Sequence, residues 1–111
     1  MVTPEQLLAL ATSLALSGDE VAWRASASRA YYASFHHLRR VVDERVGPTS
    51  RGTAEDHALI ANGIELLDAA AAAAFVELRR ERNSADYTID APFSKARGAA
   101  ACYVAAILLR I

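Results

Sequence analysis

The chain is poor in the features that stabilise or anchor several other classes of protein. It has one cysteine, so it cannot form an internal disulfide, and no Cys/His spacing indicates a zinc site. It has no apolar run of the roughly 18 residues that span a bilayer, and its first residues lack a signal-peptide pattern. The net charge of −1 gives no overall basic signal for nucleic acid. We therefore expect a cytoplasmic protein without membrane contact.

Proline and glycine are also scarce, with three and five copies, and they separate segments of helical periodicity. The chain is 53% hydrophobic over 111 residues, enough for one domain (residues 1–111) around a single core. No segment alternates polar and apolar residues with the period of two that strands require. These features predict an all-α fold, an antiparallel bundle of four to five helices.

Capping residues mark where the predicted helices begin. Thr3, Pro4 and Gln6 form a capping-box pattern, and the second helix runs to about residue 45. The predicted caps are Thr3, Asp19 or Ser17, Thr53 and Ser94. Residues 46–53 read as an exposed loop. The residues expected on the inner face of the last helix are Ala99, Cys102, Tyr103, Ala106 and Leu109.

The second predicted helix has two different faces. At 100° per residue, one arc is mostly apolar and should be core. It holds Ala27, Tyr31, Ser34, Phe35, Leu38 and Val42. The opposite arc holds Arg29, Tyr32, His36 and Arg40, whose spacing lets neighbouring side chains meet. This polar arc is either a second packing face or a site.

A second polar group lies near the end of the fourth predicted helix. Arg79, Arg82, Asn83 and Asp86 share one helical face, and Tyr87 follows directly. Arginine suits bidentate contact with phosphate. The alternative is a solvated helix end whose arginines are neutralised by nearby acids.

Both groups carry a family resemblance. Residues 28–36 (SRAYYASFH) and residues 78–87 (LRRERNSADY) resemble the HEPN superfamily. The likeness is closest to the small single-domain branch with SRAYYAxFH and RNxADY signatures, and it covers about residues 20–110. His57 and the aliphatic residues after it also look like a helix start of that branch.

The resemblance implies a helical bundle that forms a homodimer. It also implies an RNA-binding or RNA-cleaving protein of a toxin–antitoxin or defence system. If active, it would be a metal-independent ribonuclease, but the histidine of the family's motif is absent: Tyr87 falls at or near its place. The alternative is a non-catalytic module that binds a nucleotide or a protein, such as a nucleotidyltransferase or antitoxin partner.

On this interpretation, a cleft between the two Arg82 helices of a dimer would hold the site. The candidate catalytic residues are Arg82, Asn83, Tyr87 and His36, with His36 replacing the missing base. The candidate substrate-binding residues are Arg79, Asp86, Arg29 and Tyr32. No metal or cofactor is implied. We expect His37 to face solvent and His57 to have a packing or capping role.

Overall fold

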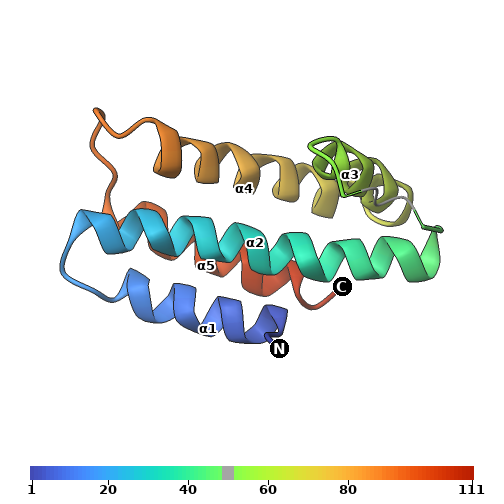
Figure 1. Ribbon diagram of the computed structural model, residues 1–111, viewed down its shortest axis with the longest axis horizontal. Coiled ribbons are helices and arrows are strands. Elements are labelled where there is room, and N and C mark those ends of the chain that lie inside the picture. The colour runs from blue at the N-terminus through green and yellow to red at the C-terminus, as the bar shows by residue number, and fades with distance from the viewer. Residues whose placement is uncertain (49–51) are drawn as a thin grey trace.

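The computed structural model describes residues 1–48 and 52–111, and within these ranges it contains five helices and no strand (Figure 1). The helices are α1 (Pro4–Ala15), α2 (Glu20–Arg45), α3 (Asp56–Leu67), α4 (Ala69–Tyr87) and α5 (Lys95–Leu108). The predicted all-α helical bundle is confirmed. In the described part of the chain, no helix is both long enough and apolar enough to cross a bilayer.

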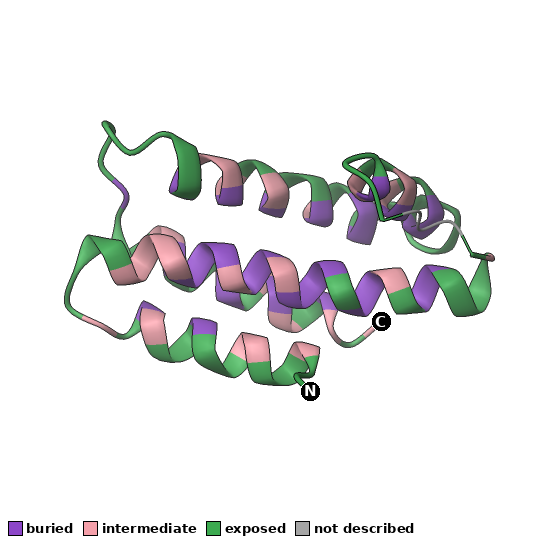
Figure 2. Ribbon diagram, in the orientation of Figure 1, coloured by how far each residue is buried: buried purple, intermediate pink, exposed green. Residues whose placement is uncertain are grey.

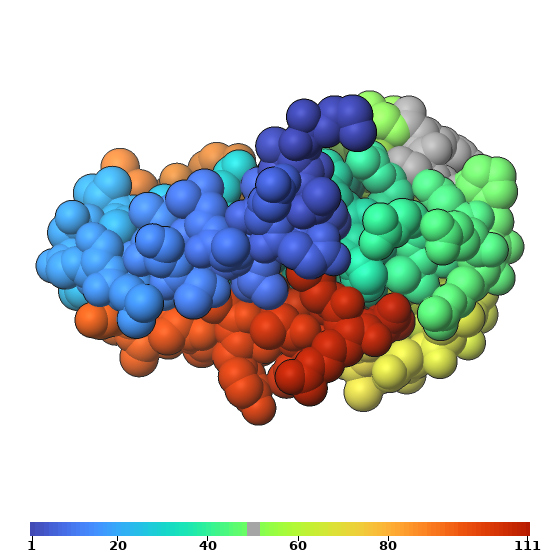
Figure 3. Space-filling view, turned by 90° about the horizontal axis from the view of Figure 1, so that it is seen from below, coloured from blue at the N-terminus to red at the C-terminus, as the bar shows by residue number. Residues whose placement is uncertain are grey.

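The long helix α2 is the centre of the bundle. α1 and α4 run antiparallel to it on opposite sides, and α5 lies behind it in Figure 1. α3 is seen nearly end-on, so it crosses the other helices steeply. Seen from below, α1 covers α2 and lies beside α5 (Figure 3). One side of α2, between α1 and α4, is therefore not covered by α5. Residues of α2 and α4 lie next to each other on this side.

The helices begin where side chains satisfy their first amide groups. Thr3 and Gln6 form the predicted capping box, and the side chains of Asp19 and Ser94 accept from amides three residues on. Thr53 was expected to cap the third helix, and that expectation is wrong. The helix begins at Asp56, and the Thr53 hydroxyl accepts from the amide of Glu55 ahead of it. The buried Asp56 accepts from the amides of Gly52 and Thr53. Residues 49–51 of the expected loop lie outside the described residues.

The apolar arc of α2 is buried as predicted (Figure 2). Tyr31 is fully buried and its ring stacks on Phe75 of α4, with centroids 5.4 Å apart and planes 13° from parallel. This contact joins the two helices that carry the predicted site residues.

Two expectations about side-chain orientation are wrong. His37 is buried rather than solvent-facing. On α5, Cys102 is buried as predicted, but Ala99 and Tyr103 are exposed and Ala106 and Leu109 are only half-buried. The other buried residues of the helix are Gly98, Ala101, Ala105 and Leu108. α5 is rich in alanine on all sides, so apolar periodicity does not select its inner face. Close approach does: a Cβ on Gly98 would lie 3.0 Å from the carbonyl oxygen of Trp23.

Candidate functional site

Arg82 is buried among three tyrosine rings. Its guanidinium carbon lies 5.1 Å from the ring centre of Tyr31, 5.5 Å from that of Tyr32 and 5.9 Å from that of Tyr87. Each ring face attracts the cation electrostatically. The predicted meeting of Arg82 with Tyr32 and Tyr87 is therefore present within one chain.

The charge of Arg82 is only partly compensated. The nearest carboxylate oxygen belongs to Asp86, 4.0 Å from an Nη atom, and that carboxylate also accepts a 3.1 Å hydrogen bond from the Ser28 hydroxyl. The Nε of Arg82 is buried and has no hydrogen-bond partner among the described residues. A buried cation with unmet donors is costly.

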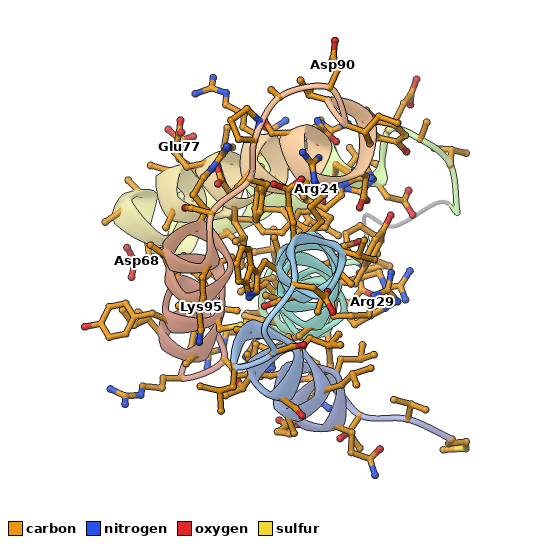
Figure 4. All side chains as sticks on the ribbon, turned by 90° about the vertical axis from the view of Figure 1, so that its left-hand side faces the viewer. Arg24, Arg29, Asp68, Glu77, Asp90 and Lys95 are labelled. Carbon is orange, nitrogen blue, oxygen red and sulfur yellow. The ribbon has the colours of Figure 1, made fainter. Side chains whose placement is uncertain are left out.

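Arg29 and Tyr32 extend this cluster along α2. The guanidinium carbon of Arg29 lies 5.3 Å from the ring centre of Tyr32. Arg29 also donates to the Ser28 hydroxyl at 3.4 Å. The helical spacing of the two residues predicts this contact, which the structure contains. Figure 4 shows Arg29 on the opposite side of the bundle from Glu77.

His36 lies at the edge of this cluster. Its ring centre is 6.4 Å from that of Tyr32, and its Nδ1 accepts from Arg39 at 3.2 Å. Burial, and then the charge of Arg39, lower the pKa of His36 below its ordinary value. His36 is therefore neutral near pH 7, but the ring nitrogen that would take a proton already accepts a hydrogen bond. Among the described residues, no contact joins His36 directly to Arg82.

Of two further predicted residues, Tyr87 contacts Arg82 and Asn83 has no recorded contact with it. Tyr87 is 73% exposed, so one side of its ring is free for a ligand while the other side approaches Arg82. Asn83 is half-buried and forms no hydrogen bond to another described residue through its side chain.

Arg79 lies apart from the cavity bordered by Arg29, Tyr32 and His36, which measures about 530 Å³. Arg79 instead lines a separate cavity of about 240 Å³ between α3 and α4, together with His57. Within the single chain, the eight predicted residues therefore do not line one cavity. Five of them connect around Arg82, and Arg79 faces elsewhere.

Sequence reasoning missed the roles of Ser28 and of the Tyr31–His57 pair. Ser28 lies between Arg29 and Asp86 and contacts both. The Tyr31 hydroxyl is hydrogen-bonded to Nδ1 of His57, and burial raises the pKa of Tyr31 well above its ordinary value. His57 does pack, as expected, but it packs beside arginines. The contact between His57 and Tyr31 could not be predicted from the sequence pattern.

No group of three or more His, Cys, Asp or Glu side chains in the described ranges is placed to hold a metal ion. Comparison with known proteins adds nothing to this picture: no protein-family model, curated protein or solved structure matches the chain.

Proposed function

We propose that the chain is a HEPN-like domain that binds RNA on the surface formed by Arg29, Tyr32, Arg82, Asp86 and Tyr87. The observation that carries the proposal is the state of Arg82. Its guanidinium is buried, holds an unpartnered Nε and has a carboxylate no closer than 4.0 Å. The Nε itself is closed to solvent, so a phosphate reaches this guanidinium through its Nη atoms.

Single-stranded RNA suits this surface better than a duplex. Tyr87 is exposed at the end of α4, next to Arg82, and an exposed ring beside a cation offers a base a stacking platform. Arg29 adds a second cation above Tyr32. A strand could place one phosphate on Arg82 and one unstacked base on Tyr87.

Binding is favoured over cleavage. Metal-independent RNA cleavage needs a group that takes the 2′-hydroxyl proton and another that protonates the leaving oxygen. His36 is the candidate base, and its Nδ1 already accepts from Arg39. In the ribonuclease version of the proposal, a homodimer would bring two Arg82 helices together in a defence or toxin–antitoxin system, with Asn83 orienting the phosphate.

A second candidate function is a non-catalytic module for a protein partner, such as a nucleotidyltransferase or an antitoxin. It is favoured by an apolar groove of about 410 Å³ between α4 and α5, lined mainly by alanines with Leu78 and Val104. Glu77, Glu81 and Arg97 border this groove, and Arg97 pairs with Glu81, so the groove lacks the unpaired cations of the Arg82 surface.

The test of RNA binding is fluorescence anisotropy with labelled single-stranded RNA, comparing wild type with Arg82→Ala. We expect at least a tenfold loss of affinity, because a hydrogen bond to a charged group is worth about 1.5–3 kcal/mol. The slope of log affinity against log salt should also fall by about 0.7 for each lost phosphate contact. Arg80→Ala is the matched control, since Arg80 lies on the same helix, is exposed and pairs with Glu77.

Arg82 is buried, so its variant must be checked by circular dichroism. Tyr87→Ala provides a second test at an exposed position, and we expect it to weaken binding without altering the melting temperature. Equal affinities for wild type, Arg82→Ala and Arg80→Ala would refute the proposal.

Cleavage is tested with the same proteins on total RNA and tRNA in EDTA. Cleavage by wild type that is lost in Arg82→Ala would favour the ribonuclease version. Sedimentation velocity on wild type then shows whether the chain is the homodimer that this version requires. RNA binding without cleavage would favour the binding version.

A further inference from the structure

The cavity between α3 and α4 is separate from the proposed RNA surface and has a chemistry of its own. Its apolar lining, called its floor below, consists of Phe75, Val76, Ala58 and Ala61, and its polar lining groups are His57, Asn62 and Arg79. These residues are one helical turn apart on each of two adjoining helices, so they border one space of about 240 Å³.

Arg79 has no hydrogen bond or ion pair with any other described residue. Its Nε is buried and unpartnered, although the side chain as a whole is only half-buried. The arginines nearest to it in sequence behave differently, because Arg80 pairs with Glu77 and Arg82 approaches Asp86. Arg79 therefore brings an uncompensated positive charge and free donors to the cavity.

His57 adds a donor whose position is fixed by Tyr31. The Tyr31 hydroxyl has no other partner among the described residues, so its hydrogen is satisfied by donation to Nδ1 of His57. The neutral ring then carries its own hydrogen on Nε2. This nitrogen has no partner in the described structure and is not sealed from solvent. Burial and the charges of Arg79 and Arg82 lower the pKa of His57, which keeps the ring neutral near pH 7.

Asn62 is exposed at the edge of the cavity, and its side-chain amide has no partner among the described residues. The cavity thus combines a guanidinium, an imidazole N–H and an amide above an apolar floor. No carboxylate lines it.

The geometry points to a binding site for a small organic phosphate monoester, with the phosphate held by Arg79, His57 and Asn62 and the organic part on the floor of Phe75. Three donor groups match the three terminal oxygens of a phosphate monoester, whereas a carboxylate has two. The apolar floor favours an ester over inorganic phosphate, because it can bury a hydrophobic or aromatic body.

The experiment is an NMR titration of the full chain with phenyl phosphate, followed through the side-chain amide of Asn62 and the ring of His57. We expect saturable shifts at both residues. Benzoate and inorganic phosphate should each bind at least fivefold more weakly, since one lacks the third oxygen and the other lacks the apolar body.

Two variants place the site. Asn62→Ala changes an exposed residue and should weaken phenyl phosphate severalfold without affecting folding. Arg79→Gln should weaken it at least tenfold, by the loss of a charged hydrogen bond. Arg80→Gln, its neighbour on the outer side of α4, should leave binding unchanged.

Several outcomes would overturn the assignment. They are no shift at His57 and Asn62, equal binding of benzoate or inorganic phosphate, or equal losses in Arg79→Gln and Arg80→Gln. Displacement of phenyl phosphate by single-stranded RNA would also overturn it, because the cavity would then belong to the RNA surface. Tyr87→Ala, which changes an exposed residue of the RNA surface alone, should weaken RNA binding and retain phenyl phosphate binding, so this proposal and the RNA proposal fail independently.

Discussion

Arg24 and Arg79 lie on neighbouring helices of the same bundle and have opposite surroundings. Arg24 donates from Nη1 to the backbone carbonyls of Ala85 and Thr88, at 3.0 and 3.1 Å, and from Nε to Glu20 at 3.2 Å. It also donates to Ala91 and lies 5.5 Å from the ring centre of Phe93. Arg79 has no such partner among the described residues.

The donors of Arg24 are used in hydrogen bonds that stabilise the fold, whereas the donors of Arg79 are not used within the chain. Arg24 satisfies carbonyls that the end of α4 leaves free and ties the following loop to α2. Figure 4 shows it between these elements. Arg82 is intermediate, since tyrosine rings surround it and a carboxylate only approaches it. Both proposed binding sites use arginines that have donors without a hydrogen-bond partner among the described residues.

The largest effect should come from removing the fully partnered arginine. Arg24→Met keeps much of the aliphatic volume but leaves several carbonyls without a donor. We expect the free energy of unfolding to fall by about 3 kcal/mol, since hydrogen bonds to a charged group are worth about 1.5–3 kcal/mol each and do not add fully. Urea denaturation measures it, with Arg80→Met as control. If the free energy of unfolding falls no more in Arg24→Met than in Arg80→Met, Arg24 does not have the structural role that distinguishes it from Arg79.

A smaller effect concerns pH, because burial and then the charges of Arg79 and Arg82 act on the pKa of His57. The pKa of His57 is lower in the folded chain than its ordinary value of about 6.5. The unfolded chain therefore binds the proton more readily. Stability should be full above that ordinary value and should decrease as the pH falls through the lowered pKa.

This dependence is tested by measuring the melting temperature between about pH 8 and pH 5, the range in which histidine titrates. His57→Gln should reduce the acid-side loss. It should not abolish it, because burial also lowers the pKa values of His36 and His37. An identical pH profile for wild type and His57→Gln would mean that His57 is not coupled to folding.

The smallest effect on stability should come from Arg79→Gln, within about 0.5 kcal/mol, as for a surface substitution with no partner to lose. The same variant should raise the pKa of His57, which NMR titration of the ring measures. A large loss of stability would show that Arg79 has a structural role like that of Arg24.

The sequence predicted more of the fold than of the site. Thr3, Asp19 and Ser94 mark helix starts because capping depends on residues three positions apart. The contact between Arg29 and Tyr32 was predictable for the same reason. His37 and Tyr103 were placed on the wrong faces, since a helix that packs on several sides has no single apolar stripe.

What the sequence determined by itself was local: an all-helical chain, the starts of three helices and the inner face of α2. Tertiary structure decided which arginines of the described residues have a charge or hydrogen-bond partner and which have none. Arg24 contacts carbonyls about 60 residues away in sequence, and Tyr31 of α2 contacts His57 in the first turn of α3. Hydrogen-bond partners at such separations are set by how helices cross, because periodicity fixes the face of one helix and leaves open what that face will contact.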